Sequence, residues 1–114
     1  FDSGMEGPTV LFRAELDALP IAEDNDIAWA SQVDGKSHVC GHDGHMTMLL
    51  ALGRMLTRDP VATGRVVLMF QPAEEDGSGA KAVVADPAYK QIKADWAFAI
   101  HIEPGSDMFR PVRD

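Results

Sequence analysis

Eight consecutive residues carry a dense group of side chains that bind metals or act as nucleophiles. The segment 38–45 contains the only cysteine of the chain, Cys40, with three of its four histidines and one aspartate. Cys, His and carboxylate groups are the ligand types that suit zinc and related divalent ions. Because only Gly41 separates Cys40 from His42, this pair can bind one ion or flank two. Packing alone does not call for such a composition, so we interpret the segment as a chemical site.

The same segment is compatible with two other interpretations. A cysteine beside histidines can be an inert, half-buried thiol near solvated imidazoles. Alternatively, Cys40 is a nucleophile that His42 or His45 activates. That mechanism needs a third group to orient the base, and Asp43 is close enough in sequence to do so. The segment by itself leaves all three interpretations open.

Composition describes a small, acidic, globular unit. The 114 residues, of which 46% are hydrophobic and 25% charged, make at most one domain. A formal net charge of −8 argues against nucleic acid and anionic membranes as partners. No apolar run approaches the roughly 20 residues of a membrane helix. A single cysteine cannot form an internal disulfide, which fits a reducing compartment, and we expect a cytoplasmic protein.

The apolar pattern predicts alternating strands and helices. Runs of β-branched and apolar residues that end at Gly, Pro or acidic residues predict strands, and apolar residues at helical spacing predict helices. The predicted strands are 9–14, 66–70 and 95–100, and the predicted helices are 46–58 and 80–85. Residues 21–37 are acidic and irregular, and loops of this length are usually functional or mobile. This order predicts an α/β fold, a layered sheet with mostly parallel strands flanked by helices.

Polar groups follow the predicted strands at the same end. Ligands of open α/β sheets bind beyond the carboxyl ends of the strands. The residues placed just past a predicted strand are Asp17, Glu74, Glu75 and His101. The helix predicted to begin at Met46 places the segment 38–45 at that edge too, where a helix N-terminus favours thiolates and anions. The convergence of four segments favours a metal site over a solvated surface.

The adjacent carboxylates Glu74 and Glu75 suggest two different tasks. Neighbouring residues in extended backbone point in roughly opposite directions. One carboxylate can therefore bind metal while the other takes a proton from a metal-bound water. The alternative is an ordinary acidic surface loop. The roles of the other two histidines of the segment stay open. His45 either forms a hydrogen bond to substrate or to a metal ligand, or faces water. We expect His38 to lie outside the direct metal ligands or in solvent.

Four motifs, taken in order, resemble a family of metal-dependent amidohydrolases. The motifs are 12–20, 38–45, 70–75 and His101 followed by Pro104. They resemble hippurate hydrolase, N-acyl-amino-acid hydrolases and plant auxin-conjugate hydrolases, members of the aminoacylase and di-metal exopeptidase superfamily. The resemblance extends over residues 9–104.

The resemblance implies a site with two divalent metal ions, zinc or manganese. The metal ligands that it implies are Cys40, His42, Glu75 and His101. It implies that Glu74 is the general base and acid and that Asp17 supports catalysis near the metals. Glu15 stands where close relatives often have Asp, and we do not expect this carboxylate exchange to alter the chemistry. Ile102 and Glu103 replace an aromatic residue common in relatives, which leaves substrate preference open.

The implied reaction is hydrolysis of the amide bond of N-acyl amino acids or related small amides. Residues 1–114 would then be part of the catalytic domain, its N-terminal half. A last histidine ligand and a lid and dimerisation domain would lie outside them, and the full-length enzyme could be a homo-oligomer. Two alternatives remain: a metal-binding fragment without catalysis, and thiol catalysis by Cys40. Chelators would inactivate a metallohydrolase, whereas alkylation would inactivate a thiol enzyme.

Overall fold

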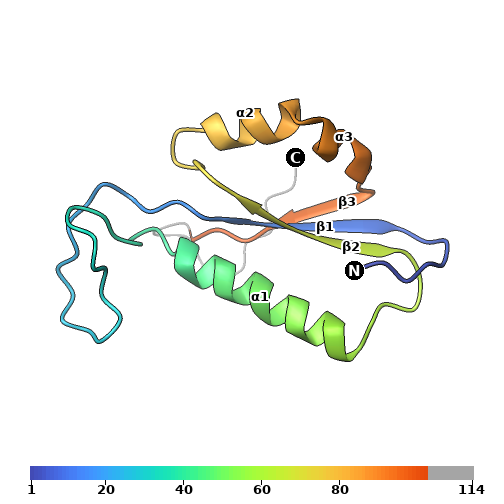
Figure 1. Cartoon of the computed structure of the whole chain (residues 1–114), viewed down its shortest axis with the longest axis horizontal. Helices are drawn as coiled ribbons and strands as arrows, with labels where there is room; N and C mark the ends of the chain where they lie inside the picture. The colour runs from blue at the N-terminus through green and yellow to red at the C-terminus, as the bar shows by residue number, and fades with distance from the viewer. Residues whose placement is uncertain (103–114) are drawn as a thin grey trace.

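Three parallel strands and three helices make up the part of the chain that the computed structural model describes, residues 1–102. The elements in order are β1 (Thr9–Glu15), α1 (His42–Arg58), β2 (Arg65–Gln71), α2 (Ser78–Ala85), α3 (Pro87–Ile92) and β3 (Trp96–Ala99). Helix α1 covers one face of the sheet, and α2 and α3 lie on the other (Figure 1). The predicted α/β fold with parallel strands flanked by helices is confirmed.

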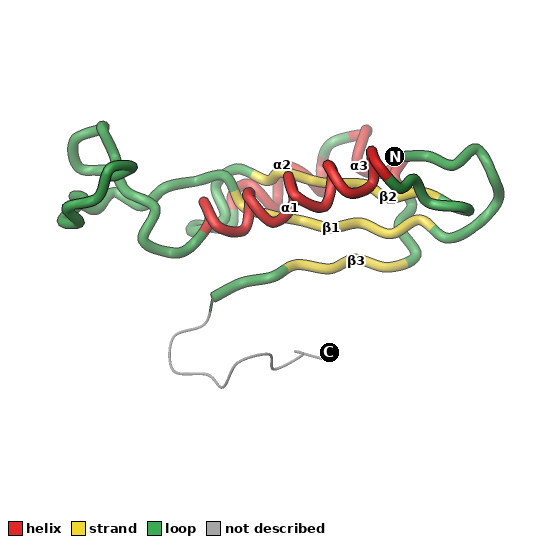
Figure 2. Tube along the Cα trace, turned by 90° about the horizontal axis from the view of Figure 1, so that it is seen from below, coloured by secondary structure: helices red, strands yellow, loops and turns green. Residues whose placement is uncertain are grey.

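Strand β1 is the centre of the sheet. The strand order is β2-β1-β3, and β1 pairs in parallel with both neighbours. Its register runs from Thr9 opposite Arg65 to Glu15 opposite Gln71 on the β2 side. The chain therefore crosses through α1 to one side of β1 and returns through α2 and α3 to the other side (Figure 2). All three strands consequently end at one edge of the sheet.

Helix α1 begins four residues earlier than the apolar pattern predicted. It starts at His42 rather than Met46, after Gly41 in the left-handed conformation with φ of 82°. Glycine adopts that conformation without the strain of a Cβ. The first turn is polar, so hydrophobic spacing could not reveal it. His42 and His45 are three residues apart and lie on the buried face of this turn, in line with Leu49.

A short helix was missed between the second predicted helix and the last strand. Residues 87–92 form α3, although 90–93 had no predicted element. The Asp86 side chain accepts the backbone N–H of Ala88, and Pro87 occupies the start of the helix. Both are known helix-start signals, which here also end the preceding helix. Within residues 1–102, no helix is long and apolar enough to cross a membrane.

Buried side chains gather around β1. The buried apolar residues are Leu11, Ala14, Leu49 and Val66, and the buried polar residues are Glu15, Ser37, His42, His45 and Gln71. The polar group belongs to the ends of β1 and β2, the start of α1 and the loop before it. Strand β3, in contrast, is exposed along its length. The carboxyl edge of the sheet is therefore unusually polar for a buried region.

The predicted irregular region is confirmed. Residues 21–37 contain no helix or strand. An isolated bridge joins Leu19 and Ser37, and the Ser37 hydroxyl donates to the carbonyl of Ile21 at 2.8 Å. The loop extends beyond the sheet at the end where α1 begins (Figure 1). Because the bridge between Leu19 and Ser37 joins the two ends of the loop, the chain returns to the carboxyl edge of the sheet just before Cys40.

Candidate metal centre

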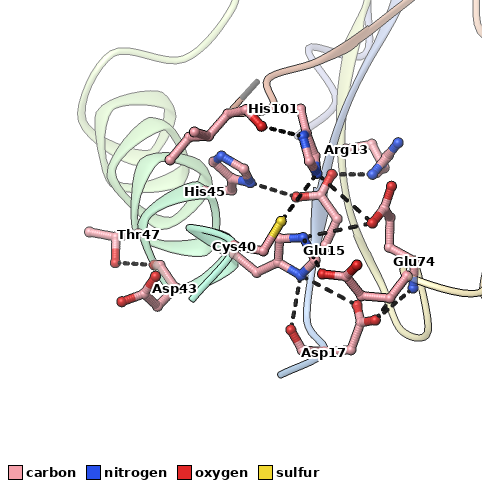
Figure 3. A network of polar contacts seen from close by, with 12 residues as sticks. Arg13, Glu15, Asp17, Cys40, Asp43, His45, Thr47, Glu74 and His101 are labelled. Atoms are coloured by element: carbon pink, nitrogen blue, oxygen red, sulfur yellow. Dashed lines mark hydrogen bonds and ion pairs between the residues drawn. The ribbon is translucent and has the colours of Figure 1, made fainter. Parts of the chain in front are cut away.

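Three imidazole rings meet at the carboxyl edge of the sheet. His42 and His45 come from the first turn of α1, and His101 follows β3. The ring centroids are 5.8 Å apart for His42 and His45, 5.6 Å for His42 and His101, and 5.5 Å for His45 and His101. Figure 3 shows Cys40, Glu15, Asp17 and Glu74 in one network of polar contacts with His45 and His101. Segments distant in sequence therefore converge as predicted.

His42 lies at the centre of the possible ligand groups. Its side chain is 1% exposed, and its Nδ1 donates to the backbone carbonyl of Asp17 at 2.9 Å. That bond leaves the lone pair on Nε2, the arrangement found in metal-binding histidines. Among the described residues, Nε2 has no hydrogen-bond partner. A buried acceptor without a partner costs about 1–3 kcal/mol, so a ligand is expected there.

Two carboxylates face the lone pair of His42. Glu74 Oε2 lies 3.7 Å from His42 Nε2, and Glu75 Oε1 lies 3.8 Å from the same atom. These distances are too long for hydrogen bonds. Ligands of one tetrahedral zinc ion, with bonds of about 2.1 Å, are roughly 3.4 Å apart. The separations therefore fit groups arranged around a shared cation.

The prediction that Glu74 and Glu75 point in opposite directions is wrong. It assumed extended backbone, but β2 ends at Gln71, and Ala73 has a positive φ of 48°. Glu75 follows in a turn. The turn brings both carboxylates towards His42 at nearly equal distances. Geometry alone therefore does not separate a metal ligand from a general base.

Asp17 connects the end of β1 to this turn. Its Oδ2 accepts the backbone N–H of Glu74 at 2.8 Å and that of Glu75 at 3.2 Å. Burial opposes ionisation of the Asp17 carboxyl, but backbone hydrogen bonds from Glu74, Glu75 and Asp17 itself, together with nearby His42, hold its pKa below the usual range. Asp17 therefore carries negative charge while it fixes the backbone of both glutamates.

Cys40 and His101 form the opposite side of the cluster. Cys40 Sγ lies 3.9 Å from His101 Nε2, and His101 Nδ1 donates to the Ile102 carbonyl at 2.9 Å. Burial raises the pKa of the Cys40 thiol, and the nearby carboxylates of Glu75 and Glu74 raise it further. A divalent cation would reverse that effect, since it stabilises the thiolate. The negative groups around Cys40 therefore favour a bound cation over a free thiolate nucleophile.

The possible ligands form three overlapping groups that share His42. In each group the ligand atoms lie within 4.8 Å of one another. The groups are Cys40 with His42 and His101, His42 with Glu74 and Glu75, and Glu15 with His42 and His45. The structure thus brings together the four implied metal ligands, Glu74 and Asp17, whereas Asp43, the possible orienting group of a thiol mechanism, is exposed and belongs to none of these groups. His38 lies exposed in the loop before α1.

Glu15 and His45 form a buried pair that the sequence did not reveal. His45 is 3% exposed, and its Nδ1 lies 2.7 Å from Glu15 Oε2. The alternative that His45 faces water is therefore wrong. Glu15 is 0% exposed and also pairs with Arg13. One signal could have found the pair: Glu15 ends a buried strand, and His45 lies one helical turn after His42.

The fold and the cluster together define a class of protein in which possible metal ligands gather at the carboxyl edge of a parallel α/β sheet. The chain belongs to peptidase family M20/M25/M40, whose sequence model matches residues 11–112. The family predicted from the four motifs is confirmed.

Named relatives agree with this assignment. IAA-amino acid hydrolase ILR1-like 6 of Arabidopsis thaliana is 48% identical over 96 residues, which cover 83% of this chain and 20% of the relative. N-acetyldiaminopimelate deacetylase of Oceanobacillus iheyensis is 44% identical over 93 residues, which cover 82% of this chain and 25% of the relative. The chain therefore spans a fifth to a quarter of the length of these two relatives.

Solved structures confirm the fold. A Bacillus subtilis protein described as a dinuclear metal binding peptidase from the M20 family superposes with a TM-score of 0.81 at 34% identity. The match covers 92% of this chain and 29% of that one. A putative aminohydrolase from methicillin-resistant Staphylococcus aureus gives a TM-score of 0.79 at 40% identity, over 88% of this chain and 27% of the other.

Proposed function

We propose that this chain is part of the catalytic domain of a metal-dependent hydrolase that cleaves the amide bond of N-acyl amino acids or related small amides. The observation that carries the proposal is the buried, unpartnered Nε2 of His42, with the carboxylates of Glu74 and Glu75 at 3.7 and 3.8 Å. Such an atom facing two acids suits a bound cation. It suits neither an apolar core nor a solvated surface.

The residues present fit a centre for two divalent ions. Cys40, His42, Glu75 and His101 would hold them, and the mixed S, N and O donors suit zinc or manganese. The dinuclear description of the Bacillus subtilis relative supports two ions. When bound, such ions polarise a substrate carbonyl and lower the pKa of a water molecule.

Glu74 is the proposed proton carrier. Its side chain is 26% exposed, so one carboxylate oxygen can face a water molecule beside the cluster while Asp17 holds its backbone. Glu74 takes the proton of the attacking water and later donates it to the leaving nitrogen. Asp17 supports this step because it keeps Glu74 in place and does not itself accept the proton.

The names of the relatives support the substrate class. By name, the Arabidopsis relative hydrolyses IAA-amino acids, and the Oceanobacillus relative deacetylates N-acetyldiaminopimelate. The shared chemistry is cleavage next to an amino acid nitrogen. A small-molecule substrate and a cytoplasmic location also agree with the acidic charge and the single cysteine.

Two matched variants of the intact enzyme test the roles of the glutamates. Glu74→Gln should keep both metal ions and lower turnover of N-acyl amino acids at least about 100-fold. Glu75→Gln should lower metal affinity as well as turnover. His38→Ala, which alters an exposed histidine outside the cluster, is the control and should change neither. Normal activity in Glu74→Gln would refute its role as general base.

A second candidate function is metal binding without catalysis. The chain spans only a fifth to a quarter of the two named relatives, which favours this reading for the isolated 114 residues. Metal analysis beside an activity assay on the isolated chain decides between them. Bound metal without turnover supports the second candidate, and turnover that chelators abolish supports the first.

A further inference from the structure

A chain of polar contacts, buried at Glu15 and His45, runs from β1 to the first turn of α1. Arg13 binds one carboxylate oxygen of Glu15, and the other oxygen lies 2.7 Å from Nδ1 of His45. Figure 3 shows the three side chains in this order beside the metal-type cluster. None of the three belongs to the proposed ligands or to the proton carrier. A fully buried carboxylate therefore has both oxygens committed to holding other side chains.

The contact with Glu15 is what orients the His45 ring. His45 Nε2 has no hydrogen-bond partner among residues 1–102, so the ring has a polar contact on one side only. Loss of the Glu15 carboxylate would remove the hydrogen bond that fixes the orientation of the ring.

The His45 ring lies against two proposed ligand rings. Its centroid is 5.8 Å from that of His42 and 5.5 Å from that of His101. His42 and His101 reach the site from different elements, the start of α1 and the segment after β3. No backbone hydrogen bond joins these two segments among those of residues 1–102. The buried His45 ring lies beside both of them and so contacts the two segments at once.

We propose that Glu15 and His45 are positioning residues of the metal centre: Glu15 fixes the His45 ring, and this ring holds the imidazoles of His42 and His101 at the separation needed to bind the metal ions. This inference rests on the proposed function. The Nε2 of His45 is buried and unpartnered like that of His42. We nevertheless assign His45 a positioning role through the rings beside it, and the proposed ligands remain Cys40, His42, Glu75 and His101. Removal of His45 should loosen the ligand geometry without removing a ligand.

The test measures metal binding in the intact enzyme, not turnover. Zinc affinity is determined by competition with a chromophoric chelator, and the absorption spectrum of the cobalt-saturated protein reports ligand geometry. In His45→Ala and Glu15→Gln we expect two bound ions at saturation, an affinity about 10- to 100-fold lower and a shifted cobalt spectrum. In Glu15→Gln the amide can serve only one of its two partners as an acceptor. Glu15→Asp keeps the charge and should recover most of the affinity.

A double variant tests whether Glu15 acts through His45. If it does, Glu15→Gln combined with His45→Ala should bind zinc no more weakly than His45→Ala alone. The control His38→Ala should match the unaltered protein, and circular dichroism confirms that each variant is folded. If His45→Ala fails to fold, the nearly isosteric Glu15→Gln carries the test.

Each outcome separates this inference from the function on which it rests. An unaltered protein that binds no metal would refute the proposed function. Normal binding in the unaltered protein, together with unchanged affinity and cobalt spectrum in both single variants, would refute the positioning role alone. Saturation of His45→Ala at one ion would show that His45 is itself a ligand, and would also overturn the inference. Additive losses in the double variant would show that Glu15 acts independently.

Discussion

The carboxylate of Asp17 accepts the backbone N–H of Glu74 at 2.8 Å, which ties the end of β1 to the turn after β2. The same oxygen accepts the N–H of Glu75 at 3.2 Å. One side chain therefore fixes the backbone of both glutamates that face His42. Asp17 thus holds a turn that contains Ala73, a residue with the unfavourable positive φ of 48°.

Replacement of Asp17 by alanine should disturb the site more than the fold. Asp17→Ala leaves two N–H groups without their acceptor, at a cost of about 1–3 kcal/mol that partial exposure reduces. We expect a loss of about 1 kcal/mol in unfolding free energy, measured in urea, and a turnover at least tenfold lower. The control is Asp76→Ala, because Asp76 accepts a backbone N–H from Ser78 in the same loop but is exposed. Equal losses of turnover in the two variants would contradict the assigned role of Asp17.

Two glycines with the same backbone conformation should respond differently to alanine. Gly41 precedes α1 with φ of 82°, and Gly77 precedes α2 with φ of 71°. A Cβ costs about 1–2 kcal/mol in this region at either position. At Gly41 it would also approach Ile102 Cδ1 to 2.3 Å, whereas nothing lies within 4 Å at Gly77. Both variants should therefore lose stability.

Metal affinity should separate these two glycine variants. Gly41 lies between Cys40 and His42, so relief of strain there moves two proposed ligands. Zinc affinity should fall about tenfold or more in Gly41→Ala and stay near normal in Gly77→Ala, as measured by chelator competition. A similar affinity in both variants would mean that the conformation at Gly41 does not set the ligand spacing.

The fold was largely predictable because its signals are local. The apolar runs of β1 and β2 are each bounded by Gly, Pro or acidic residues, and the order of elements limits the topology to a parallel sheet. The start of α1 was not predictable from hydrophobic spacing, since its first turn buries His42 and His45 instead of apolar residues. Helix α3 was missed because it is short and exposes most of its surface.

The sequence predicted which residues form the site but not which way their side chains point. Sequence order placed Asp17, Glu74 and His101 at strand ends, and the parallel sheet then brought them to one edge. It could not show that a turn at Ala73 directs both glutamates to His42, because that depends on one backbone angle. The Glu15 and His45 pair joins residues 30 apart in sequence, and only the packing of α1 on β1 reveals it.

The start of α2 should be sensitive to the size of one residue. A Cβ at Gly79 would lie 1.6 Å from the Pro72 carbonyl oxygen and 2.9 Å from that of Ala73. Both atoms are backbone, so the helix must move away from the turn that carries Glu74. We expect Gly79→Ala to lower the unfolding free energy by about 2 kcal/mol or more and to weaken zinc binding.

Gly44 provides the matched control for this change. It is also a glycine in the first turn of a helix, but nothing lies within 4 Å of its added Cβ. Gly44→Ala should therefore raise stability by about 0.5–1 kcal/mol, the usual gain of alanine over glycine in a helix. If Gly79→Ala is as stable as the unaltered protein, α2 does not hold the turn in place.

Cys40 gives a direct chemical readout of metal binding, because it is the only cysteine of the chain. The thiol is half-buried, so part of it is accessible to an alkylating reagent. A metal-bound thiolate has its lone pair engaged and reacts slowly. Saturation with zinc should therefore lower the alkylation rate about tenfold or more, and a chelator should restore it. Mass spectrometry of the labelled protein measures both rates.

Variants at the opposite side of the cluster distinguish ligation from simple burial. His101 Nε2 lies 3.9 Å from Cys40 Sγ, and a shared ion would require both groups. His101→Ala should therefore reduce the protection by zinc, whereas His38→Ala should retain it in full. Protection that is equal in the two variants would assign the effect to shielding by the fold. A thiol enzyme would show another pattern, since alkylation would abolish turnover and chelators would leave it unchanged.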